Sequence, residues 1–201
     1  MKEVQKMAKF GAMKGRLIYV IGASGSGKDT LIKTAENALA DQPDIHFARR
    51  FITRSADPDG ENHLPISRDT FNARARQGLF AMQWSGNGHD YGIGVEINTW
   101  LSHGDTVVVN GSRQWLAEAI ARYPGLVPVL IHVSPSILRQ RLKKRGRESA
   151  REIEARLLRH QHMQSQIDHC IVINNEGALI EASRAFIDAI HQPVRSTALC
   201  R

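Results

Sequence analysis

The stretch GASGSGKDT, residues 22–30, decides the fold of this chain. Its glycines and the Gly27-Lys28 pair have the spacing of a phosphate-binding loop, G-x-x-x-x-G-K-[S/T]. Glycines let the backbone curl so that successive N–H groups point at phosphate oxygens, and the lysine adds a cation for the terminal phosphates. A buried strand before the loop and a helical pattern after it favour a nucleotide site over a plain turn. The residues predicted to bind the nucleotide are Gly22, Ala23, Ser24, Gly25, Ser26, Gly27, Lys28, Asp29 and Thr30.

The residue after the lysine departs from this pattern. Such loops carry a serine or threonine there, whose hydroxyl binds Mg²⁺, whereas this chain has Asp29 and then Thr30. A carboxylate oxygen is a hard ligand suited to magnesium, so we expect Asp29 to hold the metal directly or through a bound water. The alternative is that Asp29 caps the helix and Thr30 binds the metal. Because consecutive helical residues point about 100° apart, Thr30 is expected instead to face an inner phosphate.

Apolar strands alternate with helical patterns on both sides of an irregular middle region. RLIYVIG, residues 16–22, is a short β-rich run that ends in glycine and is typical of a buried parallel strand. A helix is expected from Lys28 to about Ala40. Further strands are expected at 105–110, 126–133 and 170–174, and further helices at 113–123, from 136 onward and at 177–191. The alternation predicts an α/β fold with a doubly wound parallel sheet.

The same pass along the chain gives its domain organisation. We expect a single domain over residues 15–191. Residues 49–103, rich in proline and glycine, break the alternation and are predicted to form a small inserted lobe with short strands and one helix. Residues 1–14 are expected to be a disordered extension, with Met1 and Met13 both possible starts, and 192–201 a loose tail.

Composition narrows the class of partner. The chain has a formal net charge of +7, with 42% hydrophobic and 23% charged residues. This balance indicates a globular protein with an anionic partner: nucleic acid, an acidic membrane surface or a small phosphorylated molecule. The basic tract 139–159 is interleaved with glutamates and has no aromatic platform or helix-turn-helix pattern, so we disfavour nucleic acid. No apolar run reaches the roughly 20 residues of a membrane span. Two cysteines, Cys170 and Cys200, suggest a reducing, cytoplasmic location, and the oligomeric state is not indicated.

Several further motifs occur in a fixed order along the chain. They are ITR (52–54), PDGENHLPISRDTF (58–71), GLFAMQWSGNGHDYG (78–92), RLKKRGRES (141–149), ARL (155–157) and INN (173–175). With the loop, they make the chain from Gly15 to about Ile190 resemble the guanylate kinases, members of the nucleoside monophosphate kinase group. The resemblance implies a P-loop NTPase fold with an inserted acceptor-binding lobe and an arginine-rich lid at 139–157. It also implies ATP and Mg²⁺ as cofactors.

The resemblance assigns roles around the transferring phosphoryl group. Lys28 would hold the β- and γ-phosphates, and Arg141, Arg145 and Arg156 would close over the group from the lid. The alternative for these arginines is a solvated basic helix face. Asn174 is predicted to lie near the adenine, the alternative being a turn residue that ends a strand.

The positions that would recognise the acceptor depart from the family. Arg50 stands where the family reads guanine with a serine, and Met82 stands where it uses a glutamate. Val109, Asn110 and Gly111 replace its aspartates. A methionine accepts no hydrogen bond from a base edge, and each buried group left unpaired costs about 1–3 kcal/mol. The departures suggest an acceptor without a base and with more phosphate.

The remaining acceptor contacts follow from the same comparison. Arg50 and Arg54 are predicted to hold acceptor phosphate, because arginine binds phosphate in a bidentate manner. Asn110 and Arg113 follow a strand at its carboxyl end, where open α/β sheets bind ligands, and would contact ribose hydroxyls or phosphate. Of the positions where family tyrosines grip the acceptor, Tyr91 is kept. His63 and Asp90 replace the others, and Asp90 would accept hydrogen bonds from sugar hydroxyls or serve only a turn.

One branch of the superfamily fits these departures. The chain closely resembles this branch, which acts in phosphonate breakdown. The resemblance implies transfer of the γ-phosphoryl of ATP to the 1-phosphate of ribose 1,5-bisphosphate, giving 5-phosphoribosyl diphosphate. The acceptor oxygen is already ionised, so catalysis needs positioning and charge stabilisation but no general base. The alternatives are a nucleoside monophosphate kinase with altered base recognition and a non-catalytic interaction module. A third is a basic nucleic-acid-binding protein, which would bind polymer in a salt-dependent way without ATP.

Overall fold

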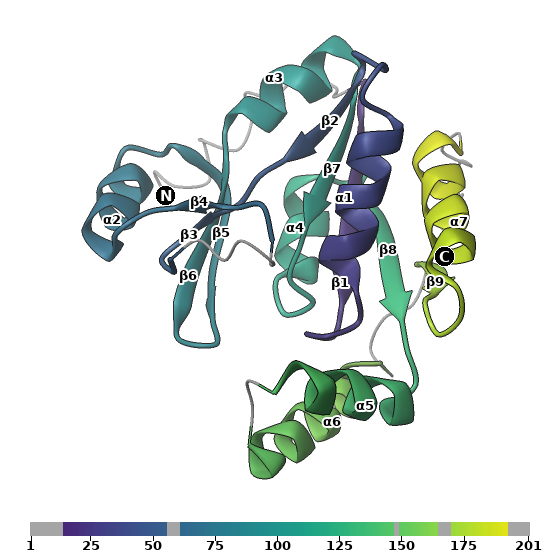
Figure 1. Cartoon of the computed structure of the whole chain (residues 1–201). Helices are drawn as coiled ribbons and strands as arrows, with labels where there is room; N and C mark the ends of the chain where they lie inside the picture. The colour runs from purple at the N-terminus through teal and green to yellow at the C-terminus, as the bar shows by residue number, and fades with distance from the viewer. Residues whose placement is uncertain (1–13, 56–60, 147–148, 165–169, 193–201) are drawn as a thin grey trace, which may run out of the picture.

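The computed structural model describes residues 14–55, 61–146, 149–164 and 170–192. The predicted N-terminal extension and C-terminal tail therefore lie, apart from residues 14 and 192, outside the described residues. The core is a five-stranded, wholly parallel sheet (Figure 1). Its strands, in spatial order, are β2 (Ile45–Ala48), β7 (Thr106–Asn110), β1 (Arg16–Gly22), β8 (Val127–His132) and β9 (Ile171–Asn174). The doubly wound α/β prediction is confirmed.

Helices cover both faces of this sheet, which is why its central strands are apolar along their whole length. On one face, α1 (Lys28–Ala38) and α7 (Leu179–His191) pack onto β1 through a core that includes Ile18, Leu31 and Phe186. On the other face, α3 (Glu96–His103) and α4 (Leu116–Arg122) pack around Tyr19 and Leu101. The phosphate loop therefore follows β1, a strand that is packed between two layers of helices.

A second sheet lies beside the first (Figure 1). Its strands, in spatial order, are β4 (Leu64–Pro65), β3 (Phe51–Ile52), β6 (His89–Gly94) and β5 (Phe80–Gly86). The β5–β6 hairpin turns at Asn87 and Gly88, whose φ angles of 50° and 79° are those that a tight two-residue hairpin loop demands. Helix α2 (Arg68–Arg76) covers this sheet through Phe71, whose ring lies 4.7 Å from that of Phe80.

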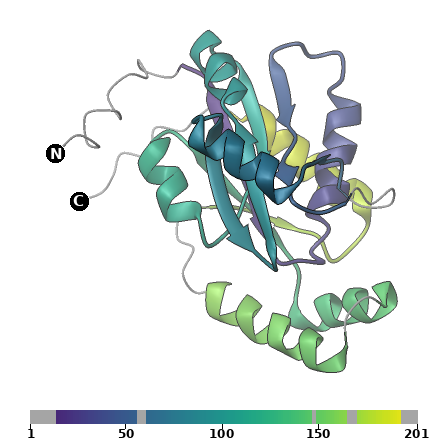
Figure 2. The ribbon, with the colours of Figure 1, turned by 90° about the vertical axis from the view of Figure 1, so that its left-hand side faces the viewer.

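Two further helices lie beyond the carboxyl end of β8. They are α5 (Pro135–Arg145) and α6 (Ala150–Gln164), which pack side by side below the sheet (Figures 1 and 2). Leu138, Leu142, Ile153 and Leu157 form a small core with Ala23 of the phosphate loop. This core holds the helix pair that carries the basic tract directly against the loop.

Two elements were not predicted from the sequence. Strand β2 is only four residues long and pairs with β7 at the edge of the main sheet, too short a run to show a clear pattern. Helix α3 lies within the irregular region 49–103 but packs on the main sheet through Ile97 and Leu101. Helix α4 begins at Leu116, three residues later than expected.

No helix within the described part of the chain has the length and hydropathy that a membrane crossing requires.

Candidate active site

The phosphate loop lies between the end of β1 and the start of α1. Gly25 and Gly27 have φ angles of 92° and 89°, in the left-handed region that favours glycine. A Cβ atom on Gly27 would lie 2.4 Å from the side-chain nitrogen of Asn175, so no larger residue fits there. The Lys28 ammonium donates hydrogen bonds to the carbonyls of Gly22 (3.2 Å) and Ala23 (3.1 Å), which places it across the loop.

Two side chains from distant segments brace the loop at Ser26. The Asn175 Nδ2 group donates to the Ser26 carbonyl at 2.7 Å. Arg141 donates from Nη1 to the same carbonyl at 3.2 Å and from Nη2 to the Asn175 carbonyl at 2.7 Å. Asn174, the predicted adenine contact, is exposed, and its Oδ1 accepts from the backbone N–H of Glu176 at 3.0 Å. Asn175 was not predicted from the sequence, although it ends the same INN run, 173–175. Its side chain is buried against the loop, whereas that of Asn174 is exposed.

The other lid arginines occupy different positions. Arg156, on α6, donates from Nη1 to the Ser24 hydroxyl at 2.9 Å and so contacts the loop. Arg145 is exposed in the last turn of α5. The structure therefore brings Arg141 and Arg156 to the loop from two different helices.

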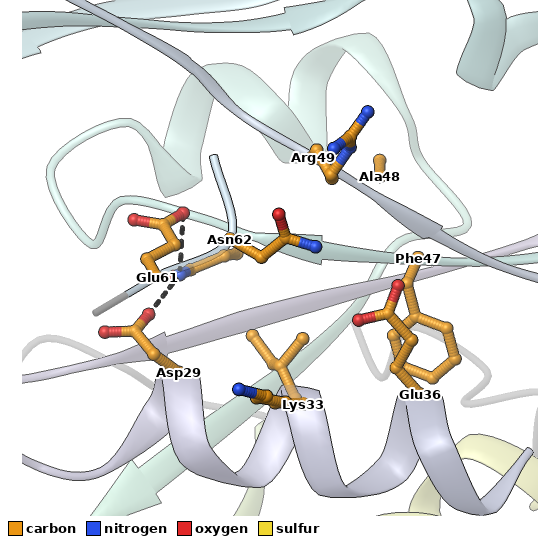
Figure 3. A pocket seen from close by; sticks show the side chains of 10 residues that line it. Asp29, Lys33, Glu36, Phe47, Ala48, Arg49, Glu61 and Asn62 are labelled. Atoms are coloured by element: carbon orange, nitrogen blue, oxygen red, sulfur yellow. Dashed lines mark hydrogen bonds between the residues drawn. The ribbon is translucent and has the colours of Figure 1, made fainter. Parts of the chain in front are cut away.

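Asp29 lies in the first turn of α1 and faces the carboxyl end of β7. Its Oδ1 accepts a hydrogen bond from the Asn110 amide at 2.7 Å, and the Glu61 carboxylate accepts from the same amide at 3.4 Å (Figure 3). The Asn110 Oδ1 atom is buried, and no hydrogen-bond partner for it is found among the described residues. Thr30 is exposed on the next step of the helix.

These residues fit a magnesium ion. Mg²⁺ binds oxygen ligands, keeps several waters and usually takes only one or two carboxylates from the protein. Asp29 supplies one carboxylate, and Asn110, which donates to it, adds a buried oxygen. No group of three His, Cys, Asp or Glu side chains within the described ranges forms a metal cluster, which a magnesium site of this kind does not need.

The acceptor side of the site is organised around Arg50. Its guanidinium donates to both carboxylate oxygens of Glu61, from Nε at 2.6 Å and from Nη2 at 2.5 Å. It also lies over the ring of Tyr91, 5.0 Å from the centroid, and Tyr91 in turn stacks on Trp84. Glu61 was not predicted from the sequence: it lies inside the 58–71 motif, at a position to which the resemblance assigns no role.

The remaining predicted acceptor residues lie around this pair. His63 is buried, and its ring nitrogens lie 3.0 Å from the Glu61 carbonyl and 3.2 Å from the Arg54 carbonyl. The Arg54 Nε group is buried, and no partner for it is found in the part of the chain described. Asp90 accepts from the Ser85 hydroxyl at 2.7 Å. It also pairs with exposed Arg68 at 3.4 Å.

The pKa of the Lys28 ammonium is shifted by burial and by the charges of these groups. Burial lowers its pKa from the usual value to about 8. The charges of Arg50 and Arg113 lower the pKa further, while those of Asp29 and Glu61 raise it. Five charged side chains from four different segments therefore converge on the end of the phosphate loop.

This lowered pKa predicts a pH dependence of nucleotide binding. The charged ammonium is the form that attracts phosphate, so affinity falls as pH rises through about 8. With about a tenth of Lys28 charged at pH 9, the Kd for Mg-ADP is expected to rise about tenfold between pH 7 and pH 9. Calorimetric titration measures this, and Lys28→Arg, which stays charged, should show a flat profile. A wild-type Kd that is unchanged up to pH 9 would contradict the assignment.

The position of Asp29 predicts a second result. Asp29→Ala should lower kcat/KM about 10²-fold and raise the Mg²⁺ concentration needed for half-maximal rate, since a charge-stabilising ligand is lost. The same variant should reduce the gain in ATP affinity that Mg²⁺ confers in a binding titration. Thr30→Ala, one residue along the same helix, is the matched control and should stay within about threefold of wild type. Equal, mild effects of both changes would leave Asp29 as a helix cap.

Comparison with known proteins identifies the family. Residues 14–190 match the guanylate kinase family model. The chain is 45% identical to "Ribose 1,5-bisphosphate phosphokinase PhnN" of Thiobacillus denitrificans, over 88% of this chain and 93% of that protein. It is 50% identical to the protein of the same name from Yersinia pestis, over 82% and 85%, and 48% identical to that from Desulfomicrobium baculatum, over 87% and 94%. The chain belongs to the guanylate kinase family, and within it to the ribose 1,5-bisphosphate phosphokinases.

A solved structure supports the fold. The guanylate kinase from Anaplasma phagocytophilum superposes with a TM-score of 0.64 at 16% identity, over 88% of this chain and 83% of that chain. As a member of the ribose 1,5-bisphosphate phosphokinases, the chain is an ATP-dependent phosphotransferase. This confirms the activity class predicted from the sequence. The kinase reading is favoured over the interaction module.

The burial of Met82 bears on how the acceptor is recognised. Met82, at the place of the glutamate that reads guanine in the resemblance, is fully buried in the core beneath the site. It therefore presents no group to an acceptor. The Arg50–Glu61 pair, with Tyr91 beneath it, is the polar feature at the position of the lost serine.

Proposed function

We propose that this chain transfers the γ-phosphoryl group of ATP to the 1-phosphate of ribose 1,5-bisphosphate, giving 5-phospho-α-D-ribose 1-diphosphate and ADP in phosphonate catabolism. The observation that carries the proposal is the largely buried Arg50–Glu61 pair over Tyr91, at a position where the family reads a base. Together with membership in the ribose 1,5-bisphosphate phosphokinases, it supports an acceptor that has phosphate but no base. The partners are then ATP and a small phosphorylated sugar, in a cytoplasmic setting.

The chemistry suits the groups present. A non-bridging oxygen of the 1-phosphate attacks the γ-phosphorus, and the bond from that phosphorus to the β–γ bridging oxygen breaks, with the electron pair leaving on ADP. The attacking oxygen is ionised near neutral pH, so no side chain has to remove a proton. The protein instead positions two anions and offsets their charge. Magnesium, when bound at Asp29, neutralises charge on the ATP phosphates.

The residues on the nucleotide side have separate roles in the transfer. Lys28 moves from the loop carbonyls to the β- and γ-phosphates of ATP. Arg141 and Arg156, which already contact the loop at Ser26 and Ser24, stabilise the transferring group from the lid. We propose that Arg145 joins them when α5 and α6 close. Each contributes a cation where negative charge develops.

On the acceptor side, arginines hold the phosphates. Arg54, whose buried Nε has no partner in the described chain, is the first of these. Arg50 and Arg113, whose charges act on Lys28, are the others. We propose that Asn110 and Asp90 contact sugar hydroxyls. His63, predicted as a substrate contact, has both ring nitrogens at backbone carbonyls, and we propose that it holds the segment that carries Arg54.

Isotope labelling tests the reaction. ATP labelled at the γ-phosphorus is incubated with ribose 1,5-bisphosphate, Mg²⁺ and the purified protein, and the products are separated and examined by ³¹P NMR. The proposal expects the label in the terminal phosphorus of a sugar 1-diphosphate, formed in equal amount with ADP. Label that appears only in inorganic phosphate would contradict it.

A further inference from the structure

Glu61 fixes the direction of Arg50. Both of its carboxylate oxygens accept from the guanidinium, at 2.6 and 2.5 Å, and the two side chains are only 11% and 12% exposed. A bidentate pair of this kind sets the plane of the guanidinium as well as its distance. The ring of Tyr91 covers one face of the same group. Arg50 is therefore held along one edge and on one face.

The pairing leaves part of the guanidinium for a ligand. Glu61 uses the Nε–H group and one N–H of Nη2, so the N–H groups on Nη1 and the other side of Nη2 remain. Nη1 makes no hydrogen bond with the described residues, and the charge of Arg50 acts on Lys28 at the end of the loop. The edge opposite Glu61 can thus donate to phosphate oxygens while the carboxylate keeps the group in place.

Glu61 also links the acceptor side to the nucleotide side. Its Oε1 accepts from the Asn110 amide at 3.4 Å, and that amide donates to Asp29 at 2.7 Å (Figure 3). Glu61, Asn110 and Asp29 come from three separate segments that meet along one cleft. The contacts with Arg50 are much shorter than the one with Asn110, so Glu61 acts chiefly through Arg50.

We propose that Glu61 is a positioning residue for the acceptor: it holds Arg50 with its free N–H groups toward the acceptor phosphate. This inference rests on the proposed function. The effect on acceptor binding that we expect from removing Glu61 is opposite to the effect that simple charge repulsion would give. A carboxylate that merely lay near an anionic acceptor would weaken acceptor binding, and its removal would strengthen it. If Glu61 positions Arg50, its removal weakens acceptor binding although a negative charge has been lost.

Glu61→Gln tests the proposal because it keeps the size of the side chain and removes its charge. With Mg-ATP, the KM for ribose 1,5-bisphosphate should rise about tenfold or more, since a charge-assisted hydrogen-bond pair is lost. The KM for ATP should change less than about threefold, and Glu61→Asp should recover part of the acceptor affinity. Calorimetric titration of the acceptor alone should give the same order of affinities. Glu181→Gln, at an exposed glutamate on α7 outside the site, is the matched control and should change neither KM.

A double-mutant cycle shows whether Glu61 acts through Arg50. In an Arg50→Met background, Glu61→Gln is expected to alter the acceptor KM less than about twofold, because the group it positions is gone. The double variant removes both charges, so it leaves no buried ion unpaired and guards against a folding defect in the single variants.

The outcomes separate this inference from the proposed function. An active wild type whose acceptor KM is unchanged or lowered by Glu61→Gln overturns the positioning role alone. So does a Glu61→Gln effect that is as large in the Arg50→Met background as in wild type. A wild type that does not phosphorylate ribose 1,5-bisphosphate overturns both.

Discussion

Replacing Lys28 with alanine should lower kcat/KM about 10³-fold or more while the protein stays folded. Lys28 is the cation at the end of a loop whose glycines hold left-handed angles, and its ammonium lies against the carbonyls of Gly22 and Ala23. Removing a charged group aimed at a transferring phosphoryl costs rates of this order. Steady-state kinetics with Mg-ATP and ribose 1,5-bisphosphate measure the loss.

Stability should not fall with activity in this variant. Burial lowers the pKa of Lys28 to about 8, which means that the folded protein disfavours the charged ammonium relative to water. Deleting the side chain removes that cost, so the Tm of Lys28→Ala is expected to equal or exceed that of wild type. Lys144→Ala, an exposed lysine on α5, serves as the control with unchanged kinetics. A Lys28→Ala protein that keeps more than about a tenth of the wild-type kcat/KM would contradict the role of Lys28.

The parts of the site that the sequence predicted are those whose chemistry is local. The loop follows from adjacent residues: glycines that must adopt left-handed angles, and a lysine that follows them in a fixed order. The same holds for β1 and α1, whose patterns change from apolar strand to amphipathic helix at that loop. Neighbouring residues carried all of this information.

The parts that it missed depend on contacts between distant segments. Asn175 reaches Ser26 across 149 residues of chain, and the Asn110–Asp29 hydrogen bond joins residues 81 apart. No periodicity in one sequence reveals such pairs. Glu61 lies only 11 residues from Arg50, yet nothing in the intervening run indicates that their side chains meet.

The sequence and the structure also describe His63 and Asn174 differently. Aligned motifs suggested that each contacts a ligand, but a motif gives the position of a residue and not the direction of its side chain. In the structure, His63 lies between two backbone carbonyls and Asn174 accepts from the turn that follows β9. Whether either contacts a ligand remains a prediction.

Acceptor choice is the second large effect that we expect. A guanine edge placed at Arg50 would meet a guanidinium already paired with Glu61, and Met82 is buried in the core and offers no acceptor. Two base groups left unpaired, at about 1–3 kcal/mol each, correspond to a loss of roughly 10²- to 10⁴-fold in kcat/KM. Ribose 1,5-bisphosphate has no base to pair and offers a phosphate to the free edge of Arg50.

The most direct test of the account compares acceptors with one enzyme preparation. Wild-type protein and Mg-ATP are given ribose 1,5-bisphosphate, GMP, dGMP, AMP or UMP, and kcat/KM is measured for each acceptor. We predict that the value for ribose 1,5-bisphosphate exceeds each of the others by at least about 10²-fold. Faster turnover of GMP, or of any other nucleoside monophosphate, than of the sugar bisphosphate would contradict the account.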